Sequence, residues 1–159
     1  MVFRDVTVKL VLLCSLCLHG SFAATTDSHT VTVTVNTINE LSIVGGNITL
    51  TVATATAGSE PDADTDATTG LLWTSNVSAK KITIQTDLSS PTFTLNAVAL
   101  GASGGTAASQ VTVSTSAQDF ITDVATTTGA CTNQYTGSAT AAEGTGSDIH
   151  SVTFTITDI

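Results

Sequence analysis

The chain contains 159 residues, of which 42% are hydrophobic, 11% are charged and 4% are aromatic. This composition is too apolar for a disordered chain and too polar for a bundle of membrane helices, so we expect a single globular domain. Thirteen acidic residues stand against four basic ones, and the formal net charge is −9. Because nucleic acids and anionic membrane surfaces repel such a chain, both are excluded as partners.

The N-terminus has the regions of a secretory signal peptide. Two basic residues, Arg4 and Lys9, precede an apolar run over residues 10–18. The small residues Ser21 and Ala23 follow the run at positions suited to cleavage. The run is shorter than the roughly 20 residues that span a bilayer, so we expect no membrane span. We predict that residues 1–23 are removed on secretion and that residues 24–159 form one extracellular or cell-surface domain.

After the signal, threonine alternates with Val, Ile, Leu or Phe along most of the chain. Alternation of β-branched residues with period two is typical of half-buried strands. Strands are predicted at residues 30–35, 47–52, 71–75, 81–85, 91–95, 110–114, 120–124, 133–138 and 151–156. Glycine-rich turns separate several of them. The fold class is therefore predicted to be all-β, an immunoglobulin-like or Greek-key β-sandwich of about seven to nine short strands.

With threonine on the outer faces, the apolar residues of the strands form the predicted core. The inner faces are predicted to carry Val31, Val33, Val35, Ile48, Leu50, Val52, Ile82, Ile84, Phe93, Leu95, Val111, Val113, Val152, Phe154 and Ile156. Trp73, the single tryptophan, is expected to be a core anchor. Cys131 is the only cysteine after the signal, so no intrachain disulfide can form; we expect a buried thiol or a bridge between chains.

The densest polar feature of the chain is an acidic loop. Asp62, Asp64 and Asp66 alternate in it, and alternating carboxylates can converge on a hard cation, so these three residues are a candidate calcium site. The loop does not match an EF-hand, because Ala67 stands at the sixth position and Trp73 at the twelfth. A solvated loop without an ion explains the same residues, and no other cofactor is expected.

The sequence offers no residues for a recognisable reaction. A hydrolase triad needs a base, and His29 and His150, the candidates after the signal, neighbour no Gly-x-Ser-x-Gly motif. Glycoside hydrolysis needs two carboxylates in an aromatic cleft, whereas the acidic residues here cluster in predicted loops. The protein is therefore expected not to be an enzyme.

The layout of the chain resembles small secreted immunoglobulin-like domains of bacterial surfaces. The resemblance is carried by the alternating segment His29-Thr-Val-Thr-Val-Thr-Val-Asn36, by residues 38–43, 79–85 and 114–120, and by a closing strand that runs almost to Ile159. In these segments the chain is similar to the major fimbrial subunits of the class 5 enterobacterial type and to the spore coat protein U group.

This resemblance implies a mode of assembly. Such subunits lack one strand of their sandwich and receive the N-terminal segment of the next subunit, which is strand addition in trans. Here residues 24–43 would be the donor segment, with Val31, Val33 and Val35 on the face that fills a groove. The residues alone leave open whether the segment pairs in trans or is the first strand of its own sandwich.

Two functions follow as alternatives. The first is a non-catalytic structural subunit of an extracellular filament, coat or biofilm matrix, which associates with identical subunits by strand addition. The second is a monomeric secreted adhesin, or a module that binds carbohydrate or another surface. Its contact surface would be the acidic loop from Glu60 to Asp66 with the neighbouring Trp73.

Overall fold

The structure, a computed structural model, describes residues 25–159; the predicted signal peptide, residues 1–23, lies outside the described residues. Its elements are β1 (Asn39–Val44), β2 (Asp64–Ser75), β3 (Lys80–Thr86), β4 (Thr94–Ser103), β5 (Thr106–Ala107), β6 (Val111–Thr112), β7 (Gln118–Val124), β8 (Thr127–Ser138), the 3-10 helix η1 (Ala141–Glu143) and β9 (Val152–Asp158). Residues 35–159 form one compact unit, and residues 25–34 are a separate one. Within residues 25–159, no helix is long and apolar enough to cross a membrane.

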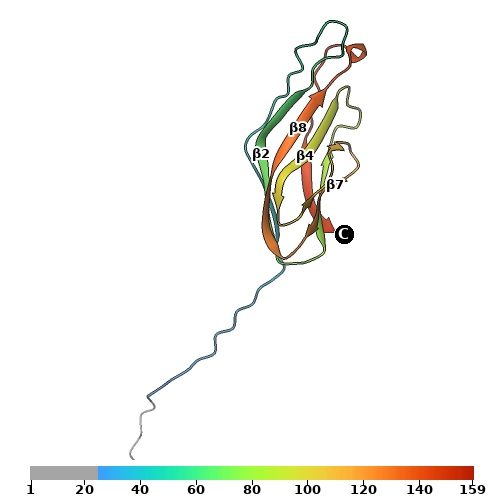
Figure 1. Cartoon of the computed structure of the whole chain (residues 1–159). Helices are drawn as coiled ribbons and strands as arrows, with labels where there is room; N and C mark the ends of the chain where they lie inside the picture. The colour runs from blue at the N-terminus through green and yellow to red at the C-terminus, as the bar shows by residue number, and fades with distance from the viewer. Residues whose placement is uncertain (1–24) are drawn as a thin grey trace, which may run out of the picture. The chain divides into compact units, whose positions relative to one another are not determined.

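The strands form two antiparallel sheets that make up a β-sandwich (Figure 1). One sheet has five strands in the order β1-β2-β8-β4-β6, and the other has four in the order β5-β7-β3-β9. This confirms the predicted all-β sandwich. β2 and β8 are the longest strands, at twelve residues each, and they lie side by side within the larger sheet.

The core lies between the sheets and takes alternate residues from most strands. Its buried apolar members are Leu71, Trp73, Ile82, Ile84, Ala97, Ala99, Val113, Phe120, Ile121, Val124, Cys131 and Tyr135. Phe120 on β7 and Phe154 on β9 place their ring centroids 5.1 Å apart at an interplanar angle of 57°. Such a tilted pair contributes about 0.5–1.5 kcal/mol beyond the burial of its area.

Trp73 is a core residue, as predicted, and only 3% of it is exposed. Its register partner on β8 is Gly129. A Cβ atom at Gly129 would lie 2.1 Å from Trp73 Cε2, so the indole packs over β8 only because this residue has no side chain. The indole Nε1 donates a hydrogen bond of 3.4 Å to the carbonyl of Gly104.

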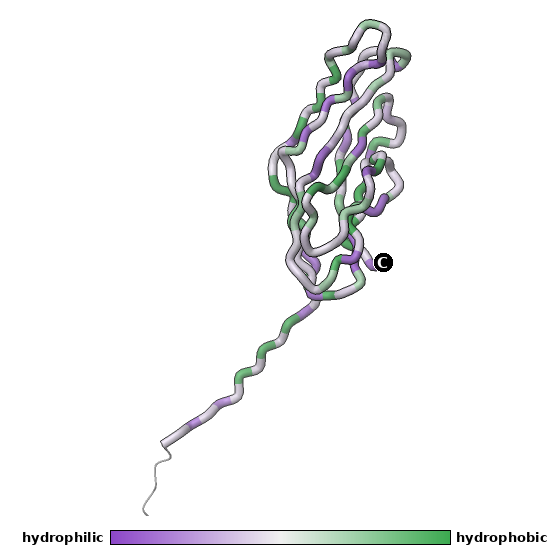
Figure 2. The backbone as a smooth tube through the Cα atoms, viewed as in Figure 1, coloured by the Kyte–Doolittle hydropathy of each residue, from purple (hydrophilic) through white to green (hydrophobic). Residues whose placement is uncertain are grey.

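The predicted strand at residues 30–35 is wrong. These residues belong to neither sheet, and Val31, Val33 and Val35 are 71%, 81% and 70% exposed, so they are not part of the core. Apolar and polar residues nevertheless alternate along the extended segment (Figure 2). Alternation makes a segment suitable for a strand, but a strand also needs a hydrogen-bonded neighbour. We call residues 25–38, which precede β1, the lead.

A second predicted strand, residues 47–52, also lies outside both sheets. Its inward residues Ile48 and Leu50 still pack against the core, and Leu50 covers Gly137 of β8. Conversely, β1 and most of β4 were not predicted from the sequence, because neither has the alternating threonine pattern. The remaining predicted strands overlap β2, β3, β4, β6, β7, β8 and β9.

Candidate functional site: an open edge between the sheets

A groove opens between β1 and β9, where one edge of each sheet comes together. β1 is hydrogen-bonded only to β2, and β9 only to β3, within residues 25–159. The groove encloses about 300 Å³ and is lined by Leu41, Ser42, Ile43, Leu71, Val152, Thr153 and Phe154. Five of these seven residues are apolar, and Leu71 at the floor is fully buried.

The β1 wall of the groove presents unpaired backbone groups and apolar side chains together. The backbone N–H of Asn76 donates to the carbonyl of Ile38 at 3.1 Å. This bond shows which residues of β1 are hydrogen-bonded to β2. Because bonding alternates along an antiparallel pair, the N–H and C=O groups of Leu41 and Ile43 point to the open edge. Their side chains share the inner face with Trp73 and Leu71, their register partners.

Ile43 shows that the sandwich is uncovered at this edge. Its side chain lies on the inner face of the sheet, yet the residue is 52% exposed, whereas its partner Leu71 is fully buried. Inner-face residues normally lose their contact with water when the facing sheet covers them. The exposure of Ile43 therefore marks apolar surface that the facing sheet leaves uncovered at the edge of β1.

The β9 wall has the same two properties. Asp87 N donates to Ser151 O at 3.3 Å, and Ile159 N donates to Ala79 O at 3.2 Å, so odd-numbered residues of this segment bond to β3. The N–H and C=O groups of the even-numbered residues then face the open edge. These are Val152, Phe154 and Ile156, whose side chains are half-buried against the core.

Both ends of β9 are tied to β3 by side chains. The carboxylate of Asp87 accepts a hydrogen bond of 2.8 Å from Ser151 N, and this bond lowers the pKa of Asp87. At the other end Lys80 forms an ion pair with Asp158. The wall of the groove is thus held in place along its length, which suits a preformed acceptor of a strand.

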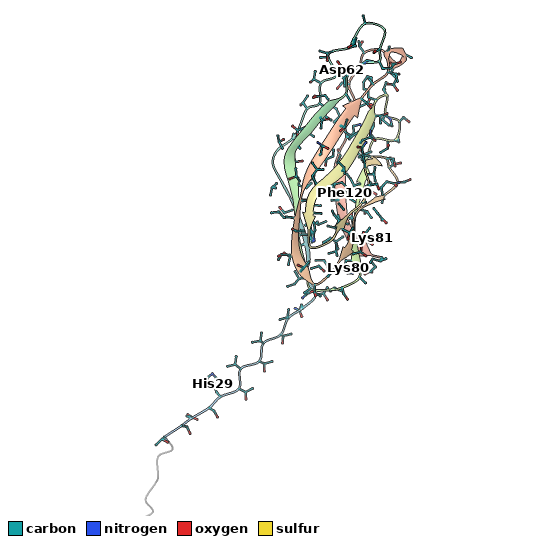
Figure 3. All side chains as sticks on the ribbon, in the orientation of Figure 1. His29, Asp62, Lys80, Lys81 and Phe120 are labelled. Carbon is teal, nitrogen blue, oxygen red and sulfur yellow. The ribbon has the colours of Figure 1, made fainter. Side chains whose placement is uncertain are left out.

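Val31, Val33 and Val35, the predicted assembly residues, lie in the lead, which is extended and exposed throughout (Figure 3). The last part of the proposed 24–43 donor segment, Asn39–Ile43, is paired with β2 of its own chain. The part that remains free of both sheets, among the described residues, is the lead itself.

The end of the lead is fastened to the sandwich by Asn76. Asn76 Nδ2 donates to the carbonyl of Asn36 at 2.7 Å, and Ile38 N donates to Asn76 Oδ1 at 2.8 Å. One residue further along, the hydroxyl of Ser75 lies 2.8 Å from Asn39 Oδ1. Asn76 begins the triplet Asn76-Val-Ser78, which is a pattern for glycosylation, and no sequence pattern pointed to its contact with the lead.

The three candidate calcium ligands are engaged separately. Asp64 accepts a hydrogen bond of 2.6 Å from Thr51 N, Asp66 accepts two from Thr68, and Asp62 accepts one from a threonine hydroxyl across the loop. No group of three or more His, Cys, Asp or Glu side chains that could share a metal ion occurs in the described part of the chain. Calcium binding here stays a prediction.

The alternative function expects Trp73 to serve as a contact residue beside the acidic loop. Trp73 belongs to the core, so its ring is not available to stack on a ligand. Asp62 and the two lysines, Lys80 and Lys81, lie toward opposite ends of the sandwich (Figure 3). The carboxylates of the loop already accept hydrogen bonds within the chain.

Cys131 is buried, so it is not placed to bridge two chains. Its Sγ donates to Asn133 Oδ1 at 3.5 Å, and burial raises the pKa of the thiol. Tyr135 follows on the same inner face of β8, and burial, with the nearby Cys131, raises its pKa to about 12. Neither group has the lowered pKa that would make it a nucleophile at neutral pH.

Comparison with known proteins identifies no relative of this chain. No protein-family model, no curated protein and no solved structure matches the chain. The structure shows an all-β sandwich of two antiparallel sheets. The groove and the lead are its candidate functional features.

Proposed function

We propose that the protein is a non-catalytic structural subunit of an extracellular filament, coat or biofilm matrix. The lead of one copy fills the groove between β1 and β9 of another copy. The observation that carries this proposal is the open edge itself, where Ile43 is 52% exposed on an inner face between two unpaired strand edges. The predicted secretion of the chain agrees with an extracellular assembly.

The lead matches β9 in length and in pattern. Residues 30–36 number seven, as does β9, and at about 3.3 Å per residue each spans roughly 23 Å. Val31, Val33 and Val35 fall on one face of such a strand, because side chains alternate. That face would rest on Leu71 while the threonines face water, so the inserted strand repeats the threonine and apolar alternation of β9 itself.

Binding of the lead would use both its valine side chains and its backbone. Burial of a valine side chain stabilises by about 1.5 kcal/mol or more, so three valines contribute about 5 kcal/mol. Association costs about 4–15 kcal/mol in lost freedom, so the valines alone do not suffice. The remaining stabilisation would come from backbone hydrogen bonds to one open edge, that of β1 or that of β9, each worth about 0.5–1.5 kcal/mol net.

The test compares two charge substitutions in the lead of residues 24–159. Val33→Asp places a carboxylate on the groove face, and we expect loss of assembly because an unpaired buried charge is costly. Thr32→Asp adds the same charge on the opposite face and is the matched control, which should still assemble. Both positions are exposed, so neither substitution alters the core. Size-exclusion chromatography with light scattering measures the assembly.

A peptide provides the complementary measurement. A chain that starts at Ile38 should be monomeric, and it should bind a peptide of residues 29–36 but not the same peptide with Val33→Asp. Equal assembly of both charge variants, or a strictly monomeric wild-type chain at high concentration, contradicts the proposal. If the shortened chain does not fold, the two full-length variants decide the matter alone.

A further inference from the structure

A subunit that carries both a donor strand and an acceptor groove must keep the two apart. This argument rests on the proposed function. A donor on a short tether has an effective concentration in the millimolar range for its own groove, far above micromolar concentrations of other copies. Unless the geometry forbids it, self-insertion therefore wins over assembly.

The residues that join the lead to β1 are the place where self-insertion is decided. β1 forms one wall of the groove, so the lead can lie beside it only if the chain reverses between Val35 and Asn39. The structure has no turn or bend there, and residues 36–38 run straight into β1. A reversal would have to use the same three residues that Asn76 holds.

The side-chain amide of Asn76 bonds to this junction as one residue of a neighbouring parallel strand would. Its Nδ2 donates to Asn36 O at 2.7 Å and its Oδ1 accepts from Ile38 N at 2.8 Å, so it bonds the residues on both sides of Thr37. A residue of a parallel strand makes this pair of bonds through its own N–H and C=O. The backbone N–H of Asn76 adds a third bond, of 3.1 Å, to Ile38 O. Together the three bonds require residues 36–38 to be extended.

We propose that Asn76 is a positioning residue that keeps the lead of each subunit out of its own groove and so directs it to a second copy. The contact is specific to an amide, because one atom must donate and the other must accept. Aspartate keeps the acceptor for Ile38 N but faces the carbonyl of Asn36 with a second oxygen. Alanine removes both side-chain bonds.

The experiment measures whether the groove of a dilute monomer is vacant. A fluorescent peptide of residues 29–36 is titrated into the full mature chain at concentrations too low for assembly. The wild-type chain should bind it. Asn76→Ala should bind it roughly tenfold more weakly, because its own lead now competes at a high effective concentration. At higher concentration this variant should give correspondingly fewer multimers, and Asn76→Asp should behave in the same way.

Two further variants separate a freed lead from a damaged groove. Asn76→Ala combined with Val33→Asp has a lead that cannot fill any groove, so peptide binding should return to the wild-type level. Asn96→Ala is the matched control: Asn96 accepts a hydrogen bond of 2.8 Å from Thr112 on strands remote from the groove, and its loss should change neither readout.

The outcomes distinguish this inference from the proposed function beneath it. Failure of both the wild-type chain and the chain that starts at Ile38 to bind the peptide would overturn strand addition itself. Binding by the shortened chain alone would overturn the role of Asn76, because the lead of the wild-type chain would then fill its own groove. Wild-type peptide affinity in Asn76→Ala would overturn only the role of Asn76. Weak binding that persists in the double variant would also overturn that role, because it would assign the loss to damage of the groove.

Discussion

At the scale of single residues, Tyr135 gives the cleanest report on the core because it is the only tyrosine in the chain. Burial raises its pKa from 10.0 to about 12 in the folded protein. We expect the absorbance of tyrosinate to appear with a midpoint near pH 12 in the folded chain and near pH 10 in denaturant. A midpoint near 10 under native conditions would show that the inner face of β8 is open to water.

The same shift sets the direction of alkaline stability. The neutral form of Tyr135 is favoured by folding, so its contribution to the free energy of unfolding is complete below pH 10. That contribution falls as the pH rises from about 10 to about 12. A chemical denaturation series across this range measures the loss.

Ile43 and Leu71 show how one register pair divides between function and stability. Both side chains lie on the inner face, but Leu71 is fully buried and Ile43 is half exposed. Truncation of Leu71 to alanine removes core packing, which typically costs 2–5 kcal/mol. Truncation of Ile43 to alanine should lower the free energy of unfolding less, because about half of this residue is already exposed. Its exposed apolar surface agrees with the proposed contact with a second copy.

At the scale of elements, the pairing of β2 with β8 depends on the contact of Trp73 with Gly129. A Cβ at Gly129 would lie 2.1 Å from the indole, and neither the ring nor the two central strands can move away. Gly129→Ala should therefore destabilise the fold by about 3 kcal/mol, at the upper end for an overpacked core. Urea denaturation followed by the fluorescence of the single tryptophan measures this.

Gly46 supplies the control for that substitution. A Cβ at Gly46 meets no atom within 4 Å, so Gly46→Ala should leave the midpoint of unfolding almost unchanged. If both alanine variants had the same stability, the close packing of Trp73 on β8 would be refuted.

The sequence predicted the strands whose alternation coincides with burial. β3 and β9 were found because their apolar residues face the core at every second position, and Trp73 was correctly assigned to the interior. β4 was mostly missed, since its inward residues Ala97 and Ala99 are small and lack β-branching. Both alanines are buried in the core, and a single sequence does not reveal where the core requires small residues.

The lead and β1 show the limit of the same reasoning. Residues 30–35 have the clearest alternation in the chain and belong to no sheet, whereas residues 39–44 alternate poorly and pair with β2. Strand propensity is local, but pairing depends on which edge is within reach. The groove could not be predicted for the same reason, because it is formed by two strands separated by more than one hundred residues in sequence.

At the scale of the whole molecule, charge opposes association between copies. The formal net charge is −9, and the two lysines after the signal are paired with Asp158 and Asp119. Repulsion between acidic copies is screened within about 8 Å at physiological ionic strength. The apolar groove and the uncharged stretch of the lead over residues 30–36 are therefore well suited to contact, because neither adds to that repulsion.

The most direct test of strand addition joins the lead of one copy to the groove of another by a disulfide. Two full mature chains, both with Cys131→Ala, carry single cysteines at Val33→Cys and Ile43→Cys and are distinguished by a size tag. When they are mixed and oxidised, we predict a disulfide-linked heterodimer, blocked by excess peptide of residues 29–36. As the control, a chain with Leu100→Cys takes the place of the Ile43→Cys chain. Leu100 is 40% exposed on the outer face, against 52% for Ile43, and it should not crosslink. Equal crosslinking at both positions, or none at Ile43→Cys, would contradict the account.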